Sequence, residues 1–289
     1  MKSMKNVLRT LVYNQQVSLT VADTTAIVRE GIRRHGLSPV SAYVFGKALS
    51  VMTFMSACLK GETGEISFSL KGDGECGEIA VSGNRRLAMR GFIENTAIGG
   101  IANEETEFAC LGKNAAVTII RDDGYSRPFV GACALPENAG IDGGFEEYFR
   151  ISEQLPTRIV SRVELDEKGD CIFAGVAVLQ PLPFADNDTL NKVESFSLSA
   201  LLDNVRQKGV AESVKSAFTE EFSVWEDRMA VYKCNCSRQY LTRVLVSLGK
   251  EQMLNIIRDD GSVHIHCHYC NTDYDFTEED ADRIFPQVD

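Results

Sequence analysis

Cys234-Asn235-Cys236 and Cys267-His268-Tyr269-Cys270 are the stretches that decide how the C-terminal part of this chain folds. Zinc in structural sites takes four soft ligands in a tetrahedron, and two close cysteine pairs supply them when the chain between them doubles back. The same spacings allow each pair to close on itself as a disulfide. We therefore predict a zinc site, and the residues leave open whether it is only structural or also a redox switch. The predicted ligands are Cys234, Cys236, Cys267 and Cys270.

The segment that carries these cysteines, residues 233–289, is too short to form a robust core of its own. Structural zinc sites contribute on the order of 10–16 kcal/mol to folding at neutral pH, so a metal would supply much of the stability of this segment. Within it we expect helices that begin near Ser237 and Lys250, a strand over 262–266, and a last helix that starts with the capping box Thr277–Asp280.

Three histidines, His264, His266 and His268, lie beside the second cysteine pair. On a strand they would share one face. One of them could replace a thiol or bind a second metal. Because four thiols are available and thiolate is the softer ligand for zinc, we predict an all-sulfur shell with the histidines outside it.

The composition is that of a globular protein, with 289 residues, 44% of them hydrophobic and 25% charged, and a formal net charge of −11. This length allows two or three domains. The negative charge disfavours a phosphate-binding surface, and residues 233–289 also hold more acidic than basic side chains. We therefore predict that the protein has no nucleic-acid partner.

The cysteine usage points to a reducing compartment. Nine cysteines are an odd number, and the five outside the two pairs are scattered along the chain, unlike a secreted disulfide framework. No apolar stretch of a signal peptide follows the first residues, so we expect a cytoplasmic protein. The scattered cysteines are predicted to be small apolar core residues. They are Cys58, Cys76, Cys110, Cys133 and Cys171.

One segment, Pro39–Leu59, is long enough to span a membrane. It carries Lys47 and several hydroxyl groups, which a spanning helix disfavours. Ser38 is a typical N-cap and Pro39 a typical first helical residue. We predict a buried helix of a soluble domain and no membrane partner.

The first 180 or so residues predict an α+β fold with an antiparallel sheet, because several alternating apolar runs follow one another without helices between most of them. The segment Gly72–Gly77 matches the dinucleotide-binding pattern G-x-G-x-x-G. The residues after it, 78–82, alternate like a strand instead of opening a helix. We therefore predict a turn or loop between two strands there, with no bound nucleotide.

The helical region in the middle of the chain follows the break at Pro181–Pro183. An apolar stripe from Leu190 to Val205 predicts one amphipathic helix, and apolar residues from Val210 to Phe222 predict a second. Short helices of this kind need a surface to cover. We divide the chain into a core domain over 1–182, a helical linker over 183–232, and a zinc-binding domain over 233–289.

Taken together, these motifs resemble the heat-shock protein 33 family of redox-regulated holdase chaperones, over the whole chain. The most specific matches are the run Cys234-Asn-Cys236-Ser237-Arg238, the run Leu248-Gly249-Lys250-Glu251, and the second cysteine pair followed by Tyr274-Asp-Phe276. Further matches lie in the first domain. They are His35-Gly-Leu-Ser-Pro39, Gly72-Asp-Gly74, Arg90-Gly91, and Tyr148-Phe149 before Ser152-Glu-Gln-Leu-Pro-Thr157.

The resemblance implies a mechanism that the residues alone do not give. It implies one zinc ion on the four thiolates of the reduced protein, and disulfides Cys234–Cys236 and Cys267–Cys270 in the oxidised one. It also implies that oxidation releases the zinc and unfolds the linker. The protein would then dimerise through its first domain and hold unfolded or partly folded client proteins without ATP. No catalytic residue, and so no enzyme activity, is expected.

Two other functions fit the cysteine motifs. A constitutive zinc-ribbon adaptor would bind a protein partner and keep its zinc under mild peroxide. A thiol oxidoreductase that used Cys267 and Cys270 would turn over disulfide substrates. Such an enzyme expects a strand leading into a helix at its C-x-x-C motif, and that pattern is missing from the sequence around Cys267.

Overall fold

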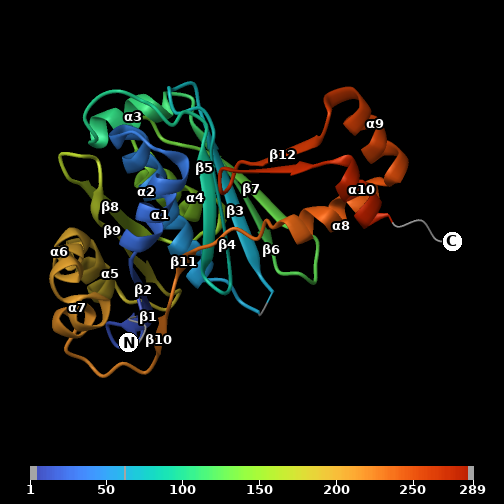
Figure 1. Ribbon diagram of the computed structural model, residues 1–289. Helices are drawn as coiled ribbons and strands as arrows, with labels where there is room; N and C mark the ends of the chain where they lie inside the picture. Colours follow the sequence, from blue (N-terminus) through green and yellow to red (C-terminus); the bar gives the residue numbers. More distant parts are fainter. Residues whose placement is uncertain (1–4, 62, 286–289) are drawn as a thin grey trace. The chain divides into compact units, whose positions relative to one another are not determined.

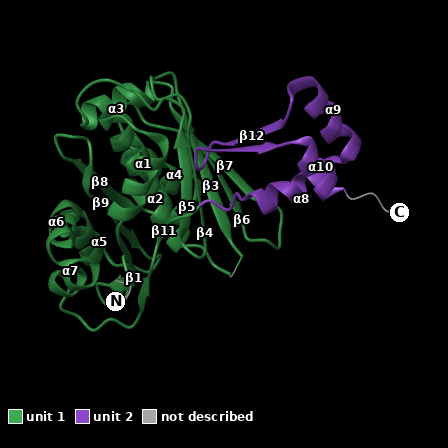
Figure 2. Cartoon of the chain, in the orientation of Figure 1, with its two compact units in different colours: residues 1–233 green, residues 234–289 purple. Residues whose placement is uncertain are grey.

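The computed structural model describes residues 5–61 and 63–285. The chain forms two compact units, Met1–Lys233 (unit 1) and Cys234–Asp289 (unit 2), coloured separately in Figure 2. The boundary of unit 2 lies next to the predicted start of the zinc-binding domain. The division of unit 1 into a core domain and a linker stays a prediction. Residues 1–4, where we expect no signal peptide, lie outside the described residues.

Unit 1 contains two sheets. The five-stranded sheet has the order β10-β1-β2-β9-β8, and each neighbouring pair is antiparallel. Its inner strand β9 is buried along almost its whole length because both faces of this sheet are covered. The strands are β1 (Val7–Val12), β2 (Val17–Asp23), β8 (Arg158–Leu165), β9 (Cys171–Pro181) and β10 (Trp225–Arg228).

The six-stranded sheet has the order β11-β5-β4-β3-β6-β7. Its pairs are antiparallel as predicted, except that the short strand β11 runs parallel to β5. The strands are β3 (Glu65–Lys71), β4 (Ile79–Asn84), β5 (Ala88–Ile93), β6 (Ala116–Asp122), β7 (Phe129–Ala134) and β11 (Val231–Tyr232).

Helix α2 (Pro39–Ala57) lies in the core between the two sheets and contacts strands of both (Figure 1). The prediction of a buried helix is confirmed, since 94% of the most apolar 18-residue stretch of this helix is buried. Ser38 is its N-cap and Pro39 its first residue, as predicted. The helices packed around it in unit 1 are α1 (Thr25–His35), α3 (Glu104–Leu111) and α4 (Gly140–Ser152).

Three helices cover the other face of the five-stranded sheet: α5 (Asn187–Ser195), α6 (Leu198–Lys208) and α7 (Val210–Ala217). The prediction of two helices is wrong here. The first splits where Phe196 and Ser197 leave helical geometry and Ser197 caps α6. The second ends at Ala217, before Phe222.

The covering helices and the sheet beneath them share a hydrophobic core. Buried residues of the helices pack on buried residues of β1, β2 and β9. After α7, the chain returns to the same sheet through β10, where Trp225 pairs with Thr10 of β1. The Glu220 carboxylate also accepts hydrogen bonds from the backbone N–H groups of Tyr13 and Asn14, at 2.6 and 2.7 Å. The helical segment is therefore attached to the sheet at both ends.

The segment Gly72–Gly77 is a loop between β3 and β4, as predicted. A Cβ atom on Gly72 would lie 2.0 Å from the carbonyl oxygen of Leu111, and one on Gly74 would lie 2.1 Å from that of Cys110. These glycines are needed because the loop packs directly on the backbone at the end of α3. The packing explains the pattern without a nucleotide.

Residues 234–285 of unit 2, the part that the structure describes, form three helices and a two-stranded sheet. Its core is small and contains residues from all five elements. Ser237 caps the first helix and accepts a hydrogen bond from the Tyr240 N–H at 3.1 Å. Thr277 and Asp280 form the predicted capping box. The elements are α8 (Arg238–Leu248), α9 (Lys250–Asp260), β12 (Val263–Cys267), β13 (Thr272–Phe276) and α10 (Glu278–Ile284).

Candidate metal centre

The second cysteine pair lies in the tight turn between β12 and β13. Cys267 ends β12, and its carbonyl oxygen accepts hydrogen bonds from the N–H groups of Cys270 and Asn271, at 3.2 and 2.8 Å. Asn271 has a φ of 51°, a left-handed conformation that asparagine tolerates better than most residues. The turn thus places both sulfurs at one end of the hairpin.

The first cysteine pair lies just before α8, and the fold of unit 2 brings it to the same place. The four Sγ atoms all lie within 4.8 Å of one another. The Sγ atoms of Cys234 and Cys267 are 3.8 Å apart, and those of Cys236 and Cys270 are 2.9 Å apart. Bonds of about 2.3 Å from zinc to sulfur give a tetrahedron with edges of about 3.8 Å. The Cys234–Cys267 separation has this length, and the Cys236–Cys270 separation is shorter. The four thiols are unbonded to one another, and the group is consistent with metal binding.

Two side chains next to the sulfurs join the first pair to the hairpin. The Arg238 guanidinium donates to the carbonyl oxygen of Asp275 at 2.8 Å and to the Asp280 carboxylate at 2.7 Å. It also lies 4.3 Å from the centre of the Phe276 ring. The Tyr274 hydroxyl lies 3.4 Å from the Cys236 sulfur. These contacts fix the chain on both sides of the cluster.

Four thiols this close cannot all ionise unless a cation balances their charge. Burial raises the pKa of Cys236 to about 11, and it also raises the pKa of Cys267 and Cys270. Burial acts in the same direction on Cys234, but hydrogen bonds from the other three cysteines together lower the pKa of this thiol. The group thus contains three thiols with a raised pKa and one with a lowered pKa, and thiolate is the form that binds metal.

The three histidines do not belong to the group of sulfurs. His264 and His266 lie on β12, directly across from Asp275 and Asp273 of β13. The His268 ring lies 4.9 Å from the His266 ring, centre to centre. The hydrogen bond with Asp275 raises the pKa of His264. The structure groups four sulfurs without an imidazole, and the all-sulfur shell stays a prediction.

The five scattered cysteines lie in unit 1, and four of them are buried. Burial raises the pKa of Cys76 to about 12 and that of Cys171 to about 11, so these thiols stay protonated at neutral pH. Cys58 is half-buried against the core. Their prediction as core residues is confirmed for the four that are buried.

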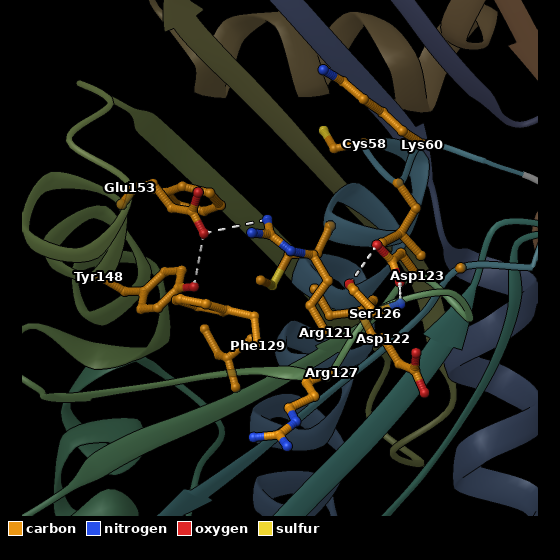
Figure 3. Close-up of a pocket in the computed structure, with 16 residues that line it drawn as sticks. Cys58, Lys60, Arg121, Asp122, Asp123, Ser126, Arg127, Phe129, Tyr148 and Glu153 are labelled. Atoms are coloured by element: carbon orange, nitrogen blue, oxygen red, sulfur yellow. Dashed lines mark hydrogen bonds and ion pairs between the residues drawn. The ribbon is translucent and has the colours of Figure 1, made fainter.

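A pocket of about 430 Å³ in unit 1 lies between the end of α2, β6 and α4 (Figure 3). The Glu153 carboxylate lies 3.4 Å from the Arg121 guanidinium and accepts a hydrogen bond of 3.0 Å from the Tyr148 hydroxyl. In Figure 3 the ends of Lys60 and Arg127 lie on opposite sides of this group. The polar groups that meet in the pocket bind one another and do not form an open set of ligands.

Some residues that matter for the structure were missed by the sequence reasoning. Lys47, noted only as an argument against a membrane span, forms an ion pair with Glu107 at 2.7 Å in the core of unit 1, with Asp142 at 3.5 Å. A lysine inside an otherwise apolar helix was a signal that a buried acid would face it. Nothing local marked Glu107 as that acid, because its partner lies on another helix.

The chain is similar to known proteins over nearly its full length. A family model described as "Hsp33 protein" matches residues 5–277. The 33 kDa chaperonin of Acetivibrio thermocellus is 31% identical over 271 residues, which cover 91% of this chain and 90% of that protein. The 33 kDa chaperonin of Ruminiclostridium cellulolyticum is 30% identical over 270 residues and 91% of each chain. That of Bacillus subtilis is 26% identical over 99% of each.

The fold is similar to a solved structure. The crystal structure of the 33 kDa chaperonin from Thermotoga maritima superposes with a TM-score of 0.81 and covers 97% of each chain, at 21% sequence identity. The α+β fold with helices in its middle region is therefore a known arrangement. In this chain its C-terminal part carries a group of four cysteines.

Proposed function

The chain belongs to the Hsp33 family, and on that basis we propose that it is a cytoplasmic, ATP-independent holdase chaperone that oxidation activates. In this role it binds unfolded or partly folded client proteins under oxidative stress and has no enzyme activity. The observation that carries the proposal is the group of four sulfur atoms within 4.8 Å of one another in unit 2. Family membership supports the chaperone function, and the sulfur group supports the switch.

We propose that the four sulfurs hold one zinc ion in the reduced protein. The donor set of four thiols within 4.8 Å of one another supports zinc over harder cations, which prefer oxygen ligands. When bound, zinc would keep the four sulfurs as thiolates and connect the first cysteine pair to the hairpin. The small core of unit 2, with seven buried apolar residues, makes this connection important for stability.

Oxidation acts on the two cysteine pairs. Cys234 with Cys236, and Cys267 with Cys270, each give up two electrons as thiolates and form one disulfide. For each disulfide, one hydrogen peroxide accepts the two electrons, takes two protons from the solvent and becomes two molecules of water. Because all four sulfurs lie within 4.8 Å of one another, each pair can close after local movement. Disulfide sulfur is a poor zinc ligand, so the oxidised unit loses its metal and much of its stability.

The helical segment over 183–232 is the part that we expect to respond. Helices α5 to α7 cover one face of the five-stranded sheet through a shared apolar core. If they detach, apolar surface becomes exposed on the helices and on the sheet. Contiguous exposed apolar surface binds unfolded chains and also a second copy of the protein. The client and dimer surface is accordingly placed in the domain over 1–182.

The proposal is tested by measuring zinc and chaperone activity in the same samples. A chromophoric chelator reports zinc release while peroxide is added at elevated temperature, and light scattering reports the aggregation of a heat-unfolded protein. We expect zinc release and suppression of aggregation to rise together. A thiol reductant with added zinc should restore the inactive state.

The same experiment separates the alternatives. If zinc stays bound under peroxide, or leaves without any gain in client holding, the zinc site is structural and the constitutive adaptor is the better description. The variant Cys267→Ser with Cys270→Ser removes one cysteine pair. Constant activity in this variant, regardless of peroxide, would support the switch, and normal peroxide activation would contradict it.

A further inference from the structure

Strand β7 is an edge strand of the six-stranded sheet, because within the described residues it pairs only with β6. An edge strand leaves half of its backbone N–H and C=O groups unpaired, and another strand can bind to them. The Leu135 N–H donates to the carbonyl oxygen of Ala115 at 2.8 Å, on the side of β6. Backbone groups alternate in direction along a strand, so those of Val130, Ala132 and Ala134 face away from the sheet.

The other edge strands of unit 1 are protected in ways that natural proteins use against pairing. Strands β8 and β10 each carry three charged residues, and β11 has only two residues. The charged residues are Arg158, Arg162, Glu164, Glu226, Asp227 and Arg228.

Strand β7 has none of these protections. Residues 128–136 carry no charge, and the pairing of β7 with β6 contains no bulge. Val130, Ala132 and Ala134, whose backbone groups face away from the sheet, are exposed. A regular, uncharged and exposed edge of this kind is the type to which another strand adds.

The sequence around β7 is nearly symmetric about Ala132. Pro128 and Pro136 lie at equal distances before and after it, and so do Arg127 and Glu137. Proline has no backbone N–H, so the two prolines limit the length of strand that can pair. Arg127 and Glu137 are exposed, and neither forms an ion pair with another described residue of the chain.

We propose that two copies of this chain pair through their β7 strands, which run antiparallel around a twofold axis at Ala132. In this register Val130 lies opposite Ala134 of the second copy, and Ala132 lies opposite its own equivalent. These are the residues whose backbone groups face outward, so each opposed pair exchanges both N–H···O=C hydrogen bonds. The six-stranded sheets of the two copies then form one continuous sheet.

The charges at the two ends of the strand favour a second copy over an arbitrary extended segment. The register places Arg127 opposite Glu137 of the second copy, and the twofold axis repeats this pair at the other end. A shift of the register by two residues in either direction would place a proline opposite an outward-facing residue of β7 and would separate the charges. The sequence therefore matches itself in one register.

The proposed contact is small. Residues 130–134 of two copies bury less than the roughly 1,200 Å² of a stable complex, so we expect a weak dimer that forms at high protein concentration. The edge is exposed in a structure whose cysteines are free thiols. Pairing therefore needs neither oxidation nor a client, and the inference goes beyond the proposed function.

Analytical ultracentrifugation of the reduced, zinc-loaded, full-length protein tests this inference. We expect the wild type to form dimers as its concentration approaches the millimolar range. Ala132→Pro removes one outward N–H and keeps the hydrogen bonds to β6, a position where edge strands accept proline. It should weaken dimerisation at least tenfold. Ala132→Ser keeps the N–H and is the matched control, which should dimerise like the wild type.

Two results would overturn the inference. One is a wild type that stays monomeric at millimolar concentration. The other is an Ala132→Pro variant that unfolds at the same temperature as the wild type and dimerises equally well. If this variant also suppresses the aggregation of a heat-unfolded protein less well after oxidation, the edge binds clients, and a second copy is the wrong partner.

Exchange of the charges tests the register with substitutions outside the strand. Arg127→Glu places like charges opposite each other at both ends, and we expect dimerisation to weaken at least threefold. Glu137→Arg should have the same effect, and the double variant should restore the affinity of the wild type. Arg86→Glu, in an exposed turn, is the control for net charge and should change nothing. A double variant as weak as the single variants would contradict the proposed register.

Discussion

At the scale of single residues, Arg238 shows how one side chain can hold together the elements around the candidate metal centre. Arg238 follows the first cysteine pair and binds both the backbone of β13 and the Asp280 carboxylate that caps α10. One side chain thus joins three elements of unit 2. The sequence motif after Cys236 indicated that this arginine belongs to the family pattern, but only the structure shows which groups it binds.

Replacing Arg238 by methionine should destabilise unit 2 by about 1–2 kcal/mol, because two charge-assisted hydrogen bonds are lost while the apolar stem is kept. Zinc transfer to a competing chelator should become faster in this variant. Arg243→Met is the matched control. Arg243 lies on the same helix, α8, and among the described residues its guanidinium lies near the exposed Tyr240 ring. Equal chelation rates in the two variants would contradict the role of Arg238.

The pairing of the disulfides can be read from tryptic peptides. Trypsin cleaves after Lys233, Arg238, Arg258 and Arg283, so each cysteine pair lies on its own peptide. After peroxide treatment we expect two separate peptides, 234–238 and 259–283, each lighter by two hydrogen atoms. In the structure the closest sulfurs belong to different pairs, Cys236 and Cys270. A single joined peptide would show that disulfides form between the pairs and would refute the proposed pairing.

At the scale of secondary structure, the sequence predicted elements with a local signal and missed those without one. Helix α2 was predicted at its start because Ser38-Pro39 and the apolar run that follows are local features. Helix α4 contains three glycines, at 140, 143 and 144, which disfavour a helix. It forms because Phe145, Tyr148 and Phe149 become buried, and this packing depends on distant parts of the chain.

The same reason explains the limits of the predicted topology and site. The pairing of β10 with β1 joins residues more than 200 positions apart, and no local pattern marks it. The grouping of the four cysteines could be predicted from their spacing, because two close pairs can supply the four ligands of one zinc ion, and their role as ligands stays a prediction. The carboxylates that contact the histidines lie on the opposite strand, and they could be found only once the register of β12 and β13 was known.

The ion pair between α2 and α3 should be sensitive to removal of one partner. Lys47→Met leaves Glu107 buried without its cation, and we expect a loss of about 3–5 kcal/mol in the stability of unit 1. The double variant Lys47→Met with Glu107→Gln removes both charges and keeps an acceptor for the Ile141 N–H. Chemical unfolding should show that the double variant is more stable than Lys47→Met. The opposite order would mean that the charge of Glu107 is not the source of the cost.

Helix α1 should contribute to the pH dependence of unit 1. Hydrogen bonds from Arg33, supported by Arg34, lower the pKa of Glu30 to about 2. A carboxyl group with a lowered pKa stabilises the fold above its unfolded pKa of about 4.3, and this contribution is lost as the pH falls toward 2. The group is partly exposed, so we expect only about 0.5 kcal/mol.

Thermal unfolding at pH 7 and pH 3 checks this expectation. The variant Glu30→Gln should be less stable than the wild type at pH 7, and the difference should shrink at pH 3. Glu167→Gln, in an exposed turn, is the control and should show a smaller difference at pH 7. A difference between Glu30→Gln and the wild type that grows toward low pH would have the wrong sign for a lowered pKa.

At the scale of the whole molecule, the two units differ in what holds them together. Unit 1 has an extensive core between two sheets and a second core under α5 to α7. Unit 2 has a small core and four thiols at metal-binding distances. The stability of unit 2 should therefore depend on a bound metal, and that of most of unit 1 should not.

Removal of zinc by a strong chelator under reducing conditions should show this difference. Hydrogen exchange is expected to become fast across residues 234–285, because metal binding supplies much of the folding free energy there. The amides of α2 should remain protected. If the amides of both units lost protection equally, or if those of unit 2 lost none, the stability of unit 2 would not depend specifically on the metal. Restoring zinc should restore slow exchange.

Because the helical segment is attached to the sheet at both ends, its detachment from the sheet should be readily reversible. The chain leaves the five-stranded sheet where Pro181 pairs with Val17, and it returns where Trp225 pairs with Thr10. Helices that come off while β10 stays paired with β1 remain a closed loop on their own sheet, so their local concentration stays high, of the order of millimolar. Re-docking then follows first-order kinetics that do not depend on protein concentration. A bound client must compete with the helical segment for the same apolar surface, and the helical segment is always attached to the sheet. Release of the client therefore needs no external energy once the helices have formed again.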